Sequence, residues 1–175
     1  MRTRNLRTSA LSSREELADA LQALFVTELL APSTPMWIIT PWISDVVVID
    51  NRSGRFAGLL PDMPKRPIRL VEVLTSQLQR GGSVVVACRP DDHNQSFIQH
   101  LTERTTNAGV RDQLVCRSAA ELHEKGILTR DILLSGSMNL TYNGLRRLEE
   151  SILLTDDPDA VARARHAYED RWGEP

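Results

Sequence analysis

Several features that mark whole classes of protein are scarce in this sequence. Its 175 residues include two cysteines and contain no apolar run long enough to cross a membrane. Cys88 and Cys116 lie in apolar stretches without the Cys-x-x-C spacing of metal or redox sites, so we expect buried free thiols and no metal site. Residues 1–5 are basic but are not followed by the apolar core of a signal peptide. These absences favour a cytoplasmic protein without membrane association.

An excess of charge of one sign is also missing. The formal net charge is -2 at pH 7, with 25% charged and 41% hydrophobic residues, which is typical of a soluble globular domain. Such a balance gives no overall attraction to nucleic acid or to anionic membranes. Any site for an anion must therefore be built locally.

Hydrophobic periodicity predicts helices and strands that alternate along the chain. The capping pair Ser13 and Glu16 precedes leucines at helical spacing, which predicts a helix over residues 13–30. Continuous apolar runs and alternating patterns predict strands. The predicted strands cover residues 36–40, 84–88, 114–116, 122–128, 132–134 and 149–154, and further helices are predicted over residues 68–79, from Asn94 or Ser96 to residue 107, and over residues 156–172.

The alternation of strand and helix indicates an α/β fold with a mixed sheet flanked by helices. Residues 50–67 are rich in glycine, proline and arginine and predict a long surface loop, which in a compact domain is often functional. Residues 1–12 are predicted to form a basic N-terminal arm, and residues 13–175 a single domain.

Chemically useful side chains concentrate in the last third of the sequence. His123 and Lys125 share one face if their segment is a strand, and a Gly-Ser-x-Asn turn follows at residues 136–139. Lys125 offers a fixed positive charge, Asn139 amide donors and Ser137 a hydroxyl. Imidazole can attack phosphorus or protonate a leaving oxygen near neutral pH. Preorganised groups of this kind can hold and attack a phosphodiester without a metal ion.

This constellation resembles the signature of the phospholipase D (PLD) superfamily. The matching residues are His123-x-Lys125, the Gly-Ser-x-Asn turn at residues 136–139, and Glu150. The order of predicted strands and helices also resembles that family, over about residues 15–172. The resemblance therefore implies a PLD-like fold for most of the chain.

Two positions depart from the family pattern. By strict counting the family's aspartate would fall at Arg130, and Asp131 stands one place later. Leu148 occupies the position of the family's second asparagine. Asp131 is therefore left out of the predicted site, whereas the histidine, lysine, serine, first asparagine and glutamate are unaffected.

The resemblance implies a covalent phosphohistidine intermediate that forms without a cofactor. The catalytic residues that it implies are His123, Lys125, Ser137, Asn139 and Glu150, the last of which would hold the imidazole in one tautomer. In-line displacement needs an attacking group and a leaving-group acid on opposite sides of the phosphorus, and the family supplies two histidines from two motif copies. Because this chain carries one copy, we expect a homodimer with a two-fold axis through the active site.

Small members with one motif resemble the bacterial endonuclease branch of the superfamily. Residues 124–129 and 136–144 look most like the PLD-like component of 7-deazaguanine DNA-modification clusters. That likeness implies DNA as substrate and partner proteins from a defence or modification system. Arg146 and Arg147 are predicted to contact the phosphate backbone, with solvated surface charge as the other interpretation, and Trp42 is predicted to form a wall of the site.

Two other functions stay open at this stage. One is a catalytically inactive, DNA-binding scaffold with the same fold, and the other is a phospholipid hydrolase. Basic residues around the long loop form either a rim for nucleic acid or an ordinary solvated surface; they are Arg52, Arg55, Lys65, Arg66 and Arg69.

Overall fold

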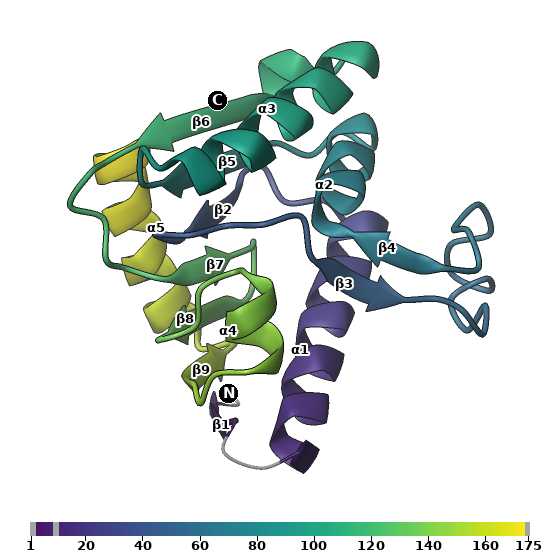
Figure 1. Ribbon diagram of the computed structural model, residues 1–175, viewed down its shortest axis with the longest axis horizontal. Coiled ribbons are helices and arrows are strands. Elements are labelled where there is room, and N and C mark those ends of the chain that lie inside the picture. Colours follow the sequence, from purple (N-terminus) through teal and green to yellow (C-terminus); the bar gives the residue numbers. More distant parts are fainter. Residues whose placement is uncertain (1–2, 9–10, 174–175) are drawn as a thin grey trace.

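A seven-stranded mixed sheet forms the centre of the computed structural model, which describes residues 3–8 and 11–173 except for the side chains of residues 11–13 (Figure 1). The strand order is β1-β9-β8-β7-β2-β5-β6. Strands β2, β5 and β6 run parallel, and the other neighbours pair antiparallel. The predicted α/β fold with a mixed sheet is therefore confirmed. The strands are β1 Thr3–Arg7, β2 Met36–Ile39, β5 Val84–Cys88, β6 Leu114–Ser118, β7 Gly126–Leu128, β8 Leu133–Gly136 and β9 Ser151–Thr155.

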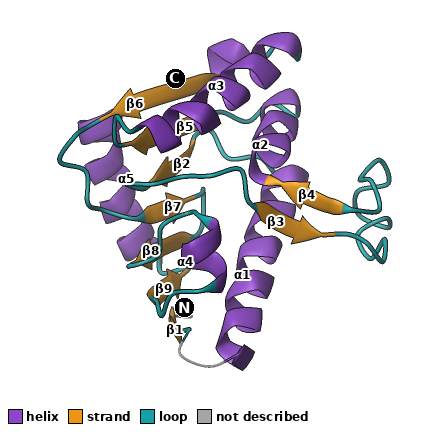
Figure 2. Cartoon of the chain, in the orientation of Figure 1, coloured by secondary structure: helices purple, strands orange, loops and turns teal. Residues whose placement is uncertain are grey.

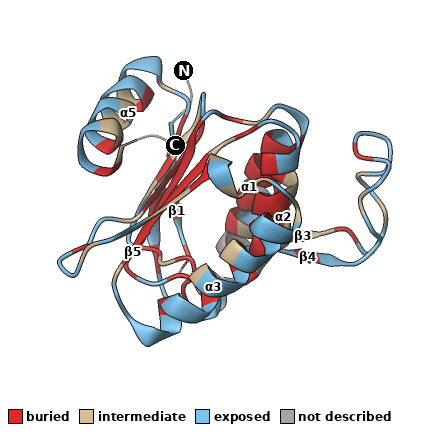
Figure 3. Cartoon of the chain, turned by 90° about the horizontal axis from the view of Figure 1, so that it is seen from above, coloured by how far each residue is buried: buried red, intermediate tan, exposed pale blue. Residues whose placement is uncertain are grey.

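Helices cover both faces of this sheet, with α1, α2 and α3 on one side and α5 on the other (Figure 3). Side chains of the central strands alternate between the two cores, so that Ile38 packs with the first three helices while Trp37 and Ile39 pack with α5. Burial on both faces explains why these strands are continuous apolar runs. The helices are α1 Leu11–Leu30, α2 Leu70–Gln79, α3 Asp92–Asn107, α4 Tyr142–Arg146 and α5 Pro158–Trp172, with a short 3-10 turn at Arg111–Gln113.

The N-terminal segment differs from the predicted basic arm over residues 1–12. Thr3–Arg7 forms β1, which pairs antiparallel with β9 along the edge of the sheet. Leu6 points into the core and is buried, whereas the charged neighbours face solvent. Charged side chains are usual on edge strands. The basic composition of this segment therefore predicted a loose arm where the structure has an edge strand. Residues 11 and 12 of the predicted arm belong to the first turn of helix α1, and residues 1, 2, 9 and 10 lie outside the described residues.

Several element boundaries also differ from the predictions. The strand predicted over residues 122–128 begins only at Gly126, because Gly126 pairs with Ile39, the last residue of the neighbouring strand β2. Helix α3 begins earlier than Asn94 or Ser96, with Asp91 as its N-cap accepting from the His93 N–H over 2.9 Å. Helix α1 already begins at Leu11, two residues before the predicted start.

The long loop predicted over residues 50–67 joins two short strands that were not predicted. Strands β3 Val47–Asp50 and β4 Pro67–Arg69 pair antiparallel as a separate two-stranded sheet. The loop between them projects away from the central sheet (Figure 2). A hairpin therefore carries the basic loop beyond the body of the domain.

The two thiols are free, as predicted, but only Cys88 is fully buried, since Cys116 is half-buried. Burial raises the pKa of Cys88 to about 11, and it also raises the pKa of Cys116. Among the described residues, no helix has the length and apolar character that crossing a membrane requires.

Candidate active site

The two parts of the motif meet at one end of the sheet. Because β7 runs antiparallel to β2, residues 123–125, which precede β7, lie where β2 ends. The β7–β8 hairpin returns Gly136 to the same place, where its N–H donates to the Lys125 carbonyl oxygen over 3.3 Å. These segments line an open hollow of about 600 Å³, the motif depression, which is bounded by Trp42, His123, Glu124, Lys125, Ser135, Gly136, Ser137 and Asn139.

His123 is exposed in the motif depression, and Lys125 is half-buried beside it. Lys125 Nζ lies 3.5 Å from His123 Nδ1 and donates a hydrogen bond to the His123 carbonyl oxygen. Burial lowers the pKa of Lys125, the charge of Arg89 lowers it further, and Glu150 opposes both effects. The ammonium group therefore lies within reach of an anion at the imidazole and releases its proton more readily than an ordinary lysine.

Ser137 is exposed where it lines the depression, and it is hydrogen-bonded to Glu150, which lies buried beneath it. Ser137 Oγ donates to Glu150 Oε2 and accepts from the Ser151 N–H over 2.9 Å. Glu150 is 7% exposed, and its backbone is fixed to Thr8 by two hydrogen bonds of 2.7 and 3.0 Å. Within one protomer the hydrogen bond of this carboxylate goes to Ser137 and not to His123. The glutamate thus holds the Gly-Ser-x-Asn turn in place.

Asn139 is positioned by its neighbours on two sides. Its Oδ1 lies 3.4 Å from Thr40 Oγ1, at the end of β2, which leaves the amide N–H groups as donors. Helix α4 packs directly behind it, because a Cβ added at Gly144 would lie 2.3 Å from the Asn139 carbonyl oxygen. Thr141 begins this helix as its N-cap and accepts from the Gly144 N–H over 3.3 Å. The glycine therefore permits a contact that no larger residue allows.

Trp42 forms a wall of the depression, and a residue that the sequence did not single out supports it. The Arg89 guanidinium lies 4.9 Å from the centre of the Trp42 ring, and its Nε donates to the Leu122 carbonyl oxygen over 2.7 Å. Asn94 holds the same turn, donating to Pro41 over 2.7 Å and accepting from the Ile43 N–H over 2.9 Å. Arg89 directly follows the buried strand predicted over residues 84–88. This strand ends at the same edge of the sheet as β2, and that position could have identified Arg89 as a site residue.

Three other residues of the motif region lie outside the depression. Arg146 lines a neighbouring groove beside the β3–β4 hairpin. Arg147 is exposed at the end of α4, where its carbonyl oxygen accepts from Arg14 over 3.4 Å. Asp131 lies in the β7–β8 turn at the far end of the sheet, where its charge acts on the buried Glu28. The structure therefore brings together His123, Lys125, Ser137, Asn139 and Trp42, with Glu150 beneath them, and separates the two arginines from this group.

The depression offers donors suited to the oxygens of a phosphodiester. An imidazole, an ammonium and an amide lie around it, and such groups can stabilise charge that develops on phosphorus-bound oxygens. No group of three or more His, Cys, Asp or Glu side chains that could hold a metal ion occurs within residues 3–8 and 11–173. The depression contains one imidazole from this chain, so a leaving group on the opposite side of the phosphorus needs an acid from elsewhere.

Comparisons with known proteins match both the sequence and the fold. A family model described as cardiolipin synthase, PLD-like domain, matches residues 54–172. No curated protein sequence gives a significant match. Nuc, a phospholipase D family member from Salmonella typhimurium, has a similar structure with a TM-score of 0.58 and 13% identity, covering 99% of this chain and 95% of that chain.

Two further solved structures are similar. NucT from Helicobacter pylori has a TM-score of 0.55 and 14% identity, covering 97% of this chain and 95% of that chain. A polyphosphate kinase from Porphyromonas gingivalis has a TM-score of 0.64 and 16% identity, covering 99% of this chain but 24% of that chain. Likeness at these identities concerns the fold.

The family match supports the resemblance first seen in the motif. It spans more than half of the chain and includes every motif residue from His123 to Glu150. The narrower likeness to DNA-modification clusters stays a prediction. The matched sequence and the shared fold together establish that this chain belongs to the family of PLD-like domains.

Proposed function

We propose that this protein is a metal-independent phosphodiesterase that cleaves DNA as a homodimer. The observation that carries the proposal is the grouping of His123, Lys125, Ser137 and Asn139 around one open depression. Each group has a task in the reaction, and together they need no metal ion to neutralise a phosphodiester.

The reaction begins when a ring nitrogen of His123 attacks phosphorus and forms an N–P bond. The P–O bond on the opposite side breaks, and the leaving oxygen takes a proton from the imidazolium of His123 in a second copy of the chain. Water then attacks the phosphohistidine and gives its proton to that second imidazole. The N–P bond breaks, and the products are an alcohol and a phosphomonoester.

The remaining residues of the depression stabilise this reaction. Lys125 and Asn139 donate to the two non-bridging oxygens, whose charge grows in the transition state. Ser137 and Glu150 hold the turn that carries Asn139, and Trp42 with Arg89 forms the wall. The exposure of His123 supports a second copy, because a partner subunit can then bring its own imidazole to the opposite side.

DNA as substrate and a role in bacterial DNA-modification-linked defence are further parts of the proposal. They rest on the likeness of residues 124–129 and 136–144 to small PLD-like proteins of such systems. In that setting, partner proteins in the cytoplasm would supply specificity for the modified DNA.

Plasmid cleavage in excess chelator tests the proposal. We expect the wild type to nick or cut the plasmid, His123→Ala to lose at least about 1,000-fold in rate, and His166→Ala to match the wild type. His166 is a suited control because its side chain is 85% exposed on α5. Light scattering should give twice the 19.6 kDa of one chain. Full cleavage by His123→Ala, or a mass of one chain under assay conditions, would contradict the proposal, and DNA binding without any cleavage would favour the scaffold function.

A further inference from the structure

A second hollow lies next to the motif depression, between the β3–β4 hairpin and α4. This hairpin groove has a volume of about 470 Å³ and receives arginines from three separate segments. Arg52 comes from the projecting loop, Arg69 from the end of β4, and Arg146 from α4. Tyr142 lines the same groove and is 64% exposed.

Two short main-chain segments, paired with each other, lie between the groove and the depression. Ile43 and Leu140 form a parallel bridge, and the Ser44 N–H donates to the Leu140 carbonyl oxygen over 2.9 Å. On one side of this bridge lie Trp42 and Asn139 of the depression, and on the other side lie Ser44 and Tyr142 of the groove. Because three residues of extended chain span at most about 10 Å, the groove begins within one or two nucleotides of the reacting phosphate.

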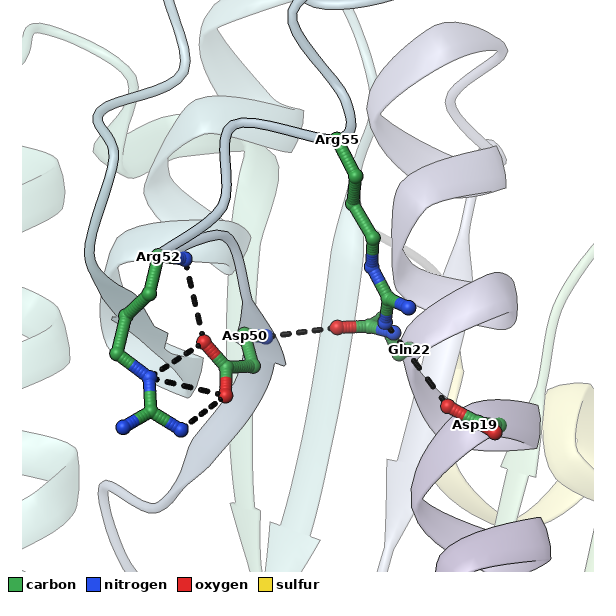
Figure 4. Close-up of polar contacts among 5 residues, drawn as sticks. All are labelled: Asp19, Gln22, Asp50, Arg52 and Arg55. Carbon is green, nitrogen blue, oxygen red and sulfur yellow. Dashed lines mark hydrogen bonds and ion pairs between the residues drawn. The ribbon is translucent and has the colours of Figure 1, made fainter.

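The charges of the groove leave a surplus of positive groups. Arg52 is bound to Asp50 with an Nη2–Oδ2 distance of 2.6 Å and lowers the pKa of that carboxyl to about 2 (Figure 4). Asp45 accepts from the Val71 N–H over 2.9 Å and lies 3.8 Å from His100. Three arginines against these two carboxylates leave the groove with a net charge of one positive unit.

The two remaining arginines of the groove are available to a ligand. Arg69 donates through Nη1 to the Asp45 carbonyl oxygen, and its Nε and Nη2 groups can still donate to a ligand. Arg146 is exposed, and the structure gives it no acidic partner among the described residues.

The hairpin base that carries these groups is fixed to the body. The Asp50 N–H donates to Gln22 of α1 over 2.7 Å, and Arg55 turns toward Asp19 on the same helix, as Figure 4 shows. Arg55 therefore lies on the α1 side and does not line the groove. A groove with fixed walls loses little entropy when a strand binds.

Resting on the proposed function, we propose that the hairpin groove holds the single strand of nucleic acid that leads away from the scissile phosphate. A phosphate lies against Arg146 and Arg69, and an unpaired base stacks on the Tyr142 ring. A positive groove with an exposed aromatic side chain is the arrangement that binds single strands without sequence preference. In a duplex the bases are already stacked within the helix, so the tyrosine has no partner there.

Fluorescence anisotropy with labelled oligonucleotides tests this assignment, with His123→Ala as the background so that no substrate is cut. We expect Tyr142→Ala to weaken single-strand binding about tenfold and Tyr142→Phe to restore it, because the phenyl ring keeps the stacking surface. Arg146→Ala should reduce the slope of log Kd against log salt by about 0.7, the value for one phosphate contact of a single strand. Arg163→Ala, exposed on α5 at the opposite face of the sheet, is the matched control and should change neither quantity.

The outcomes separate the groove from the chemistry. Equal loss of affinity for a duplex and a single strand of the same sequence would overturn the assignment, as would a change below twofold in Tyr142→Ala. Binding to anionic lipid vesicles with none to the oligonucleotide would overturn it too. In the active protein, the groove variants should lose at least fivefold more activity on an oligonucleotide than on bis(p-nitrophenyl) phosphate. Absence of all cleavage together with the expected binding changes would refute the proposed function and leave the groove assignment standing.

Discussion

A methyl group added at Gly144 would press on the main chain of Asn139, which lines the motif depression. The glycine is buried in α4, and a Cβ there would lie 2.3 Å from the Asn139 carbonyl oxygen, with further Asn139 main-chain atoms at 3.2 and 3.3 Å. Real Cβ contacts are not closer than 3.0 Å, so α4 or Asn139 must move by about 0.7 Å in a close-packed region. Because the opposing atoms belong to the main chain, no flexible side chain can absorb the shift.

Gly144→Ala is therefore expected to displace the Asn139 amide from the phosphate oxygen that it binds. A misplacement of about 1 Å can cost about 100-fold in rate, so we expect kcat to fall by about 30- to 100-fold. The assay is hydrolysis of bis(p-nitrophenyl) phosphate in excess chelator, with circular dichroism to confirm folding. Gly58→Ala is the matched control, because nothing lies within 4 Å of a Cβ at that exposed position.

Two results would refute this reasoning. The first is a folded Gly144→Ala protein whose kcat stays within threefold of the Gly58→Ala value. The second is a loss of thermal stability with unchanged kcat, which would mean that α4 moves away and leaves Asn139 in place.

Three further predictions concern charge and backbone. Arg89→Gln removes a charge that lowers the pKa of Lys125, so the alkaline limb of kcat/KM should move to higher pH, and an unchanged limb would show that the two groups do not interact. Burial raises the pKa of Glu28 above 4.5, so the wild type should lose stability relative to Glu28→Gln as pH rises from 4.5 through the raised pKa. Urea unfolding at several pH values measures this difference. Unfolding free energies of the two proteins that change equally with pH would contradict it. Gly136→Ala, at φ +151° with Ser151 O only 2.1 Å from the new Cβ, should destabilise the fold by about 2–4 kcal/mol in urea unfolding, whereas a cost below about 1 kcal/mol would exclude the clash.

Elements that bury both faces are the ones that the sequence predicts best. The run over residues 84–88 predicts β5 with the boundaries that the structure shows. The edge strand β1 was missed because an edge strand has one neighbour and tolerates charged residues, which read as a loose arm. The start of α3 was misplaced because the Asn94 side chain bonds to Pro41 and Ile43, far away in sequence, and leaves the capping role to Asp91.

The motif residues were predictable from their spacing, since a hairpin of two short strands suffices to bring residues 123–125 beside Gly136. Arg89 was not predictable in this way. Its position depends on three segments that meet only in the folded chain, namely the end of β5, the Trp42 turn and Leu122. Arg146 is close to the motif in sequence, but it lines the hairpin groove and not the motif depression.

The most direct test of the account is the identity of the group that attacks phosphorus. Protein mixed with bis(p-nitrophenyl) phosphate and quenched in alkali within a turnover should carry a p-nitrophenyl phosphoryl group on His123, left after one p-nitrophenolate departs and detected by mass spectrometry of its peptides. The adduct should persist in His166→Ala and be absent in His123→Ala. Turnover without an adduct on His123, or an adduct that forms on another residue at the same rate, would contradict the account.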